Sequence, residues 1–309
     1  MGISKKLATT LAFLLPLSLL AFLAEARLSP AFAQPAEDPK TGTLEQIIPG
    51  HYTYTNGSRV SGVIVTSEGV VVLDALTNEA MARNERQLIA SMIRQPVRYL
   101  ISSTFHDNYT GGNVVYQDVI RIGHENYKAD LLDLMKTDNV PAAQQAARLP
   151  HLTYRDRMTL NLGGKEIQIL HIGKAHTRGD SIVFVPADRI AYISELFFYD
   201  RFPWMNSGYV DWINAIDIAL NLDADIFVPG QGPANWMSNP RASRQALVRF
   251  RQILVDARDA VEKEIARGAT EDQAAATVLL AQYKGLSGYQ QQREVVVRRT
   301  YQDLKGALP

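Results

Sequence analysis

The sequence predicts an α/β fold, in which strands and helices alternate along most of the chain. Residues 69–74 and 97–102 are short, largely apolar runs typical of buried strands. Residues 78–94 between them carry apolar side chains at helical spacing, which predicts an amphipathic helix. The second strand leads directly into a loop that contains Gly111 and Gly112. Functional residues of α/β folds gather at strand ends, so this loop is the first candidate site.

The remaining elements follow from the same patterns. Gly163-Gly164 between two apolar runs is a strong hairpin signal, and Gly268 should end a long amphipathic helix. The Ala- and Gln-rich residues 140–150 are expected to be a connection without regular structure. Further strands are predicted at residues 52–55, 62–66, 119–122, 158–162, 166–170, 181–186, 189–193 and 226–228, and further helices at 125–136, 212–220, 241–267, 271–283 and 293–304.

The first 33 residues have the pattern of a secretory signal peptide. Lys5 and Lys6 precede an uncharged run over residues 7–24, and a small-x-small cleavage site ends at Ala33. The run is long for a signal peptide, so an uncleaved membrane anchor is the alternative. We therefore expect a signal segment at 1–33, a linker at 34–42, a core domain at 43–240, and helices at 241–309 that belong to the same domain. The expected location is the periplasm, with membrane contact only through an uncleaved signal segment.

Composition narrows the possible partners and ligands. The chain has 32 basic and 32 acidic residues among 309, and no sustained basic stripe, which argues against nucleic acid as a partner. Cysteine is absent, so a metal site would have to use imidazole, carboxylate or weaker oxygen ligands. The expected partner is a small-molecule ligand or a periplasmic protein.

Four blocks of the sequence resemble the metallo-β-lactamase superfamily, in the order in which that family has them. Residues 104–113 align with the family's Thr-His-x-His-x-Asp-His-x-Gly-Gly-Asn signature at its Gly-Gly-Asn end. Residues 173–180 match Gly-x-x-His-Thr-x-Gly-Asp, residues 193–197 fall where the family has Gly-Asp-Leu, and residues 228–233 fall where it has Val-Pro-Gly-His-Gly-Pro. The resemblance implies a four-layer αββα sandwich with C-terminal helices, and a site at the edge where loops of both sheets meet.

The same resemblance indicates that most metal ligands are missing. The three histidines that hold one zinc ion in the family correspond to Thr104, His106 and His176. The carboxylate that bridges two metals corresponds to Glu195. The second metal would be held by positions that are now Asn108, Tyr109 and Gln231, which are poor zinc ligands at neutral pH. The second metal site is therefore expected to be absent.

The first metal site is left open by the sequence. His106, His176 and Glu195 form a two-histidine, one-carboxylate set that suits one divalent ion, either zinc or iron. The alternative is a metal-free pocket in which Glu195 pairs with Arg178 or Arg201. The expected cofactor is accordingly either none or one divalent metal ion.

Other side chains are candidates for the pocket around these three residues. Asn108 and Tyr109 occupy catalytic positions of the family, although Asn108 lacks the carboxylate that would activate a water. Asp107 could substitute for it only if it faced the pocket. Residues 197–206 are rich in aromatic side chains and are either a packed loop or a ligand-binding wall that includes Tyr199. The ligand-binding candidates are Thr104, Asp107, Tyr199 and Gln231.

Three functions remain compatible with the sequence. The first is a pseudo-hydrolase that binds a small molecule or a partner in the former active-site cleft, and this is the interpretation we favour. The second is a hydrolase with one metal ion at His106, His176 and Glu195 that acts on an ester, thioester or lactam-like bond. The third is a redox or oxygen-handling protein that uses the same residues for iron. Two-zinc hydrolysis ranks below all three because its ligands are missing.

Overall fold

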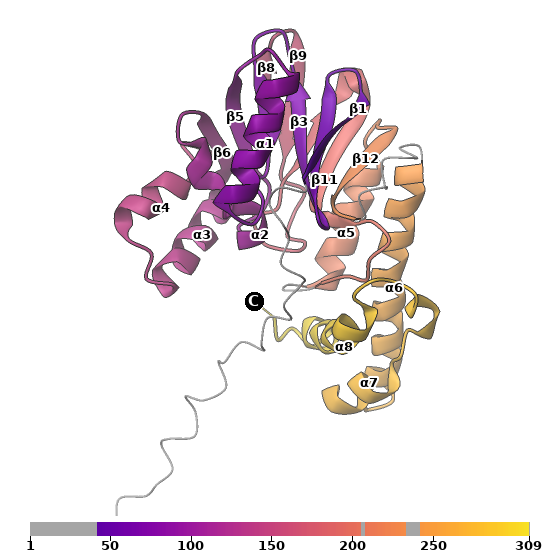
Figure 1. Ribbon diagram of the computed structural model, residues 1–309. Helices are drawn as coiled ribbons and strands as arrows, with labels where there is room; N and C mark the ends of the chain where they lie inside the picture. Colours follow the sequence, from indigo (N-terminus) through magenta and orange to yellow (C-terminus); the bar gives the residue numbers. More distant parts are fainter. Residues whose placement is uncertain (1–41, 205–207, 233–241, 309) are drawn as a thin grey trace, which may run out of the picture. The chain divides into compact units, whose positions relative to one another are not determined.

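The computed structural model describes residues 42–204, 208–232 and 242–308. The predicted signal segment at 1–33 and nearly all of the linker at 34–42 lie outside these ranges. Two β-sheets lie face to face, with helices on the outer side of each (Figure 1). This is the four-layer αββα arrangement that the sequence predicted.

The first sheet has the order β7-β6-β5-β4-β3-β2-β1. Its strands from β1 to β4 pair antiparallel, and those from β4 to β7 pair parallel, as expected where helices connect successive strands. The strands are β1 Thr43–Ile48, β2 His51–Asn56, β3 Arg59–Val65, β4 Val70–Leu73, β5 Val97–Ser102, β6 Ile120–His124 and β7 Leu152–Tyr154.

The second sheet has the order β12-β11-β10-β9-β8. The β8–β9 hairpin turns at Gly163 and Gly164, which both have positive φ, as the Gly-Gly signal indicated. A single pair of residues, Arg59 and Gln231, joins β12 to β3 of the first sheet. The strands are β8 Arg157–Leu162, β9 Lys165–Leu170, β10 Ile182–Val185, β11 Ile190–Phe198 and β12 Ile226–Gln231.

Side-chain alternation along the strands builds the layers. On β4, Val71 and Leu73 point between the sheets, whereas Val70 and Val72 point outward to the helices. On β11, Tyr192 points between the sheets and Ile193 points outward. Both faces of each central strand are therefore buried, which explains why these segments are continuous apolar runs.

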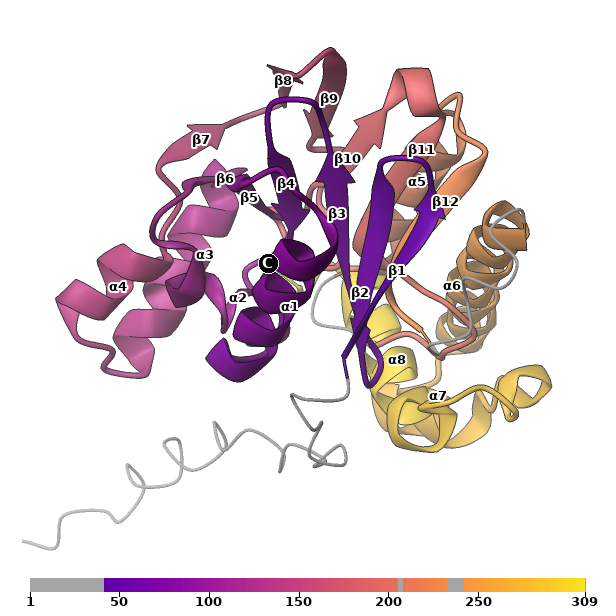
Figure 2. The ribbon, with the colours of Figure 1, turned by 45° about the horizontal axis from the view of Figure 1, so that its top comes forward.

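Helices cover the two outer faces (Figure 2). Asn78 caps α1 by accepting a hydrogen bond from the backbone of Met81, and α1 then packs on the first sheet. Helices α5 and α6 cover the second sheet, and α8 packs against both of them and against α7. The helices are α1 Glu79–Met92, α2 Asp107–Thr110, α3 Glu125–Thr137, α4 Ala142–Arg148, α5 Tyr209–Leu220, α6 Ser243–Ala266, α7 Glu271–Thr277 and α8 Tyr289–Leu304. Among the described residues, no helix is long and apolar enough to cross a membrane.

Two of the predicted segments were wrong. Residues 140–150 contain helix α4, because Pro141 sits at its N-terminus and its Ala and Gln residues favour helix. The helix predicted at 271–283 ends at Thr277, and Leu280 has a left-handed backbone conformation. Arg293 on α8 donates hydrogen bonds to the carbonyls of Ala275 and Val278, which stabilises that early end.

A buried carboxyl group lies between α1 and the first sheet. Glu85 has no exposed surface and accepts hydrogen bonds from the hydroxyls of Ser61, at 2.5 Å, and Tyr116, at 2.7 Å. Burial raises the pKa of Glu85 to about 8, despite these two hydrogen bonds. The folded protein thus binds a proton here that the unfolded chain releases near pH 4.5.

We predict that Glu85→Gln changes the pH dependence of stability. Because the pKa is raised in the folded state, the stability linked to Glu85 is complete below pH 4.5 and is lost as the pH rises through about 8. The melting temperature of Glu85→Gln relative to wild type should therefore rise between pH 6 and pH 9, by about 2 °C or more. Glu79→Gln, exposed on the same helix, is the control. If the difference in melting temperature between Glu85→Gln and wild type does not vary with pH, the prediction is contradicted.

Candidate metal centre

Four loops and strand ends meet at one edge of the two sheets and carry the candidate site. His106 follows β5 and immediately precedes α2, and His176 lies in the loop between β9 and β10. Glu195 lies in the second half of β11, and Gln231 is the last residue of β12. Residues that are far apart in the sequence are therefore brought together by the carboxyl ends of neighbouring strands.

A buried hydrogen-bond network holds these segments in place. Asp74, directly after β4, accepts hydrogen bonds from the backbone N–H of Ser103 at 2.8 Å and from the hydroxyls of Ser103 and Ser194 at 2.8 and 2.6 Å. The backbone of Ser181 donates to the carbonyl oxygen of Ser103. Ser103 directly precedes Thr104, and Ser194 directly precedes Glu195. One carboxyl group thus fixes the backbone on which two candidate site residues stand.

Backbone geometry at β11 and β12 turns Glu195 into the site. Ser194 has a φ of 52°, and the pairing of β11 with β12 shifts register at this residue. Gly230 of β12 passes so close that an added Cβ would lie 2.4 Å from the carbonyl carbon of Ser194. Only glycine fits at that point. The kink interrupts regular strand alternation, so that Glu195 faces the histidines.

Glu195 lies between the two imidazoles. Its Oε2 is 2.6 Å from Nδ1 of His106, and its Oε1 is 3.4 Å from Nε2 of His176. The two imidazole rings are 5.0 Å apart and nearly perpendicular. Among the described residues, these three form the one group of His and acidic side chains whose potential ligand atoms all lie within 4.8 Å of one another.

Charges within this cluster stabilise each other. Burial alone would raise the pKa of Glu195, but the charges and hydrogen bonds of His106 and His176 outweigh it and hold that pKa well below its usual range. Burial alone would lower the pKa of His106, but the charge and hydrogen bond of Glu195 outweigh it and raise that pKa. Glu195 and His106 therefore form a buried carboxylate–imidazolium pair.

Arg178, one of the two arginines that the sequence offered as partners of Glu195, pairs with a different carboxylate. Arg178 pairs with Asp130, at 2.5 Å, and the backbone of Arg201 bridges to Ser287. The partners of Glu195 are the two histidines instead, because both belong to loops of the same sheet edge.

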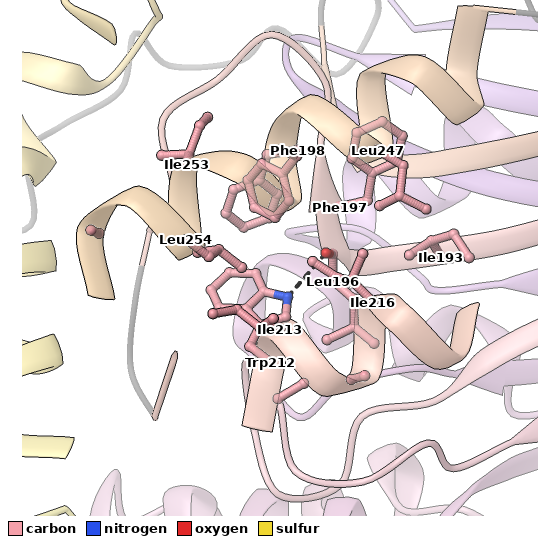
Figure 3. Close-up of a cluster of buried hydrophobic side chains, with 14 of the residues drawn as sticks. Ile193, Leu196, Phe197, Phe198, Trp212, Ile213, Ile216, Leu247, Ile253 and Leu254 are labelled. Carbon is pink, nitrogen blue, oxygen red and sulfur yellow. Dashed lines mark hydrogen bonds between the residues drawn. The ribbon is translucent and has the colours of Figure 1, made fainter. Parts of the chain in front are cut away.

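His176 is also held by its surroundings. Its ring packs edge-on against Trp212 and Phe198, at 4.9 and 5.8 Å between ring centres. Asp180 closes the loop by accepting hydrogen bonds at 2.5 Å from both the backbone N–H and the hydroxyl of Thr177. Figure 3 shows Trp212 in its buried cluster, with its indole N–H donating to the carbonyl oxygen of Leu196 at 3.1 Å.

The residues at the second-metal positions lie near one another but do not fit a metal ion. Tyr109 is fully buried and donates its hydroxyl to the carbonyl oxygen of Gly230 at 3.1 Å. Burial raises the pKa of Tyr109 well above 10, so the phenol stays neutral and is no ligand. Gln231 is buried beside it and Asn108 is half-buried, and both offer only neutral amides. The donor set is thus suited to one ion at most.

The other candidate residues differ in their accessibility. Thr104 is fully buried, and its hydroxyl makes no hydrogen bond within the described part of the chain. Asp107 is exposed to solvent rather than buried with the cluster, so it does not replace the missing carboxylate at Asn108. Tyr199 is half-buried.

Most of the described aromatic side chains in residues 197–206 are packed in the core. Phe197, Phe198 and Phe202 are buried in the cluster between the second sheet and the helices, whereas Trp204 is 41% exposed. The last two residues of this stretch lie outside the described ranges.

Sequence reasoning missed the supporting residues. Asp74 ends the apolar run 69–74, but no local pattern in the sequence connects it to Ser103 or Ser194. Trp212 was assigned only to a helix, and its contact with His176 depends on how α5 packs on the second sheet.

Comparison with known proteins agrees with this architecture. The family model of the metallo-beta-lactamase superfamily matches residues 54–231, which is more than half of the chain. The chain therefore belongs to the metallo-beta-lactamase superfamily.

Two relatives illustrate how wide that superfamily is. The chain is 27% identical over 166 residues to a metallo-beta-lactamase type 2 of Elizabethkingia meningoseptica, covering 52% of this chain and 63% of the relative. It is 25% identical over 195 residues to the 2,4-dinitroanisole O-demethylase subunit alpha of Nocardioides sp., covering 61% of this chain and 57% of the relative. The chain thus spans less than two thirds of either relative.

Solved structures support the fold. A metallo-beta-lactamase from Pontibacter korlensis superposes with a TM-score of 0.54 at 18% identity, covering 68% of this chain and 99% of that one. A stereoselective inverting sec-alkylsulfatase from Pseudomonas sp. gives a TM-score of 0.67 at 15% identity, covering 84% of this chain and 50% of that one. At these identities the likeness concerns the fold alone.

We predict that restoring the missing ligands creates zinc affinity. The combined variant Thr104→His, Asn108→Asp, Tyr109→His and Gln231→His should bind zinc at least about tenfold more tightly than wild type, because imidazole and carboxylate replace neutral groups. Zinc titration with a competing chelator measures the gain. The control is the combined variant with His106→Ala added, which should lose the gain in zinc affinity. No gain in a variant that remains folded would mean that these positions do not surround one site.

Proposed function

We propose that this protein binds a small molecule at the cluster of His106, His176 and Glu195, and that it does not carry out two-metal hydrolysis. The observation that carries this proposal is the 2.6 Å distance between Nδ1 of His106 and Oε2 of Glu195. Two ligand atoms about 2.1 Å from one tetrahedral zinc ion lie about 3.4 Å apart. The observed distance is that of a direct, charge-assisted hydrogen bond.

The exposure of the cluster supports a small ligand. The side chains of His176 and Glu195 are 1% and 4% exposed, whereas that of His106 is 14% exposed. A ligand therefore reaches the cluster through the edge of His106, which suits a small group better than a protein surface. The neutral side chains at Asn108, Tyr109 and Gln231 leave no second ion to activate or orient a water.

A second candidate is a hydrolase with one metal ion. The convergence of three donors within 4.8 Å and the 3.4 Å separation of His176 and Glu195 favour it. His106, His176 and Glu195 would hold the ion, which when bound would generate hydroxide for attack on an ester, thioester or lactam-like bond. Glu195 would have to move away from His106 to make room. Asn108 would orient a water without accepting its proton, since an amide is not basic.

Metal analysis of the purified protein distinguishes the two candidates. We expect well below one equivalent of zinc or iron in wild type, and no change in metal content in His106→Ala. The control is His151→Ala, an exposed histidine outside the cluster. Stoichiometric metal that is lost in His106→Ala and retained in His151→Ala would overturn the metal-free proposal. Turnover of a chromogenic ester or lactam that disappears in His176→Ala would then establish the hydrolase.

We also propose that the protein is exported and that its signal segment is removed after Ala33. The supporting pattern is Lys5 and Lys6, an uncharged run and a small-x-small cleavage site. N-terminal sequencing of protein from the periplasmic fraction should begin at Gln34. A membrane-bound product that begins at the original N-terminus would support an uncleaved anchor instead.

A further inference from the structure

A second cavity lies outside the histidine cluster. It has a volume of about 180 Å³. Three segments line it: the end of β11 with the residues after it, one face of α6, and the segment between α7 and α8. The residues that line this cavity include none of the candidate metal ligands.

The inner wall of the cavity is apolar and largely aromatic. Phe198 and Phe250 meet edge to face, with 5.5 Å between their ring centres, and Ala246, Ile253, Tyr283 and Leu286 also line this wall. Phe198 and Ile253 are labelled in Figure 3 within the buried cluster that the wall belongs to. A dry apolar cavity of about 150 Å³ accepts a benzene molecule. The available volume therefore suits a six-membered ring or a branched aliphatic group.

The rim of the cavity carries charged side chains of both signs. It carries Asp200, Arg201 and Arg249. Arg249 is 3.8 Å from Asp200, and the two side chains are 58% and 56% exposed. At this distance the two groups make no hydrogen bond to each other, so a bound anion at hydrogen-bond distance can replace Asp200 as the partner of Arg249. Guanidinium groups bind carboxylates through two parallel hydrogen bonds.

The rim is fixed by backbone structure. The backbone of Arg201 pairs with that of Ser287, and the N–H of Phe202 donates to the carbonyl oxygen of Ser287 at 2.9 Å. Asp200 has a left-handed backbone with a φ of 51°, which turns the chain sharply at the mouth of the cavity. A fixed rim reduces the ordering that binding would require.

We propose that this cavity binds a small carboxylate with an aromatic or branched apolar body. The apolar body lies against Phe198 and Phe250, and the carboxylate pairs with Arg249 at the rim. This site does not rest on the proposed function at the histidine cluster and uses different polar residues, although Phe198 also packs against His176.

Titration of the full-length protein with benzoate tests the proposal. Trp212 provides the signal, because its buried ring lies 5.5 Å from Phe250 and 6.0 Å from Phe198. We expect saturable binding of benzoate and at least about tenfold weaker binding of benzyl alcohol, which has the same ring without the charge. A charge-assisted hydrogen bond is worth about that factor.

Four variants locate the binding site. Arg249→Gln should weaken benzoate binding about tenfold, whereas Arg258→Gln, on the same helix but outside the cavity, should leave it unchanged. Ala246→Leu narrows the cavity and should also weaken binding. His106→Ala should have no effect, because it alters only the histidine cluster.

The proposal is overturned if benzoate shows no saturable binding at millimolar concentrations, or if Arg249→Gln binds it as well as wild type does. Loss of binding in His106→Ala with unchanged binding in Arg249→Gln would assign benzoate to the histidine cluster instead. Because Arg249 is exposed, its substitution tests the proposal even if Ala246→Leu fails to fold.

Discussion

The site of this protein depends on the buried carboxyl group of Asp74. Through Ser103 and Ser194 it joins the end of β4, the loop after β5 and the kinked part of β11, so it ties the two sheets together at the edge where the histidines lie. Burial raises the pKa of Asp74 to about 6, although three hydrogen bonds from the two serines oppose that rise. The residues that support the site are thus different from the residues whose side chains would bind a ligand or take part in a reaction.

Because the supporting residues are separate, substitutions at the candidate ligand positions leave the framework of the site in place. The positions that would hold the second ion are filled by neutral groups that bond to the protein itself, as Tyr109 does with Gly230. At the first position, Oε2 of Glu195 lies 2.6 Å from Nδ1 of His106, the distance of a direct hydrogen bond.

Local patterns in the sequence predicted the alternation of strands and helices, whereas the three clustered residues followed from its resemblance to the metallo-β-lactamase superfamily. Apolar runs and glycine turns predicted β4, β5 and the β8–β9 hairpin, and the spacing of the family blocks led to His106, His176 and Glu195. The sequence did not predict features that depend on tertiary contacts. The early end of α7 depends on Arg293 of a later helix, and the role of Ser194 depends on a change of register between β11 and β12.

The two sheets share one backbone pairing, between Arg59 and Gln231. Side-chain packing, the Asp74 network and hydrogen bonds such as that from the backbone of Ser181 to Ser103 also connect the sheets. The edge that carries the site is therefore also an edge at which the two sheets are joined. His106 lies in a loop of the first sheet and Gln231 lies in the second sheet. A ligand that touched both residues would hold the two sheets together at this edge. Its binding would slow the exchange of amide hydrogens at Arg59 and Gln231, well beyond the atoms that it contacts.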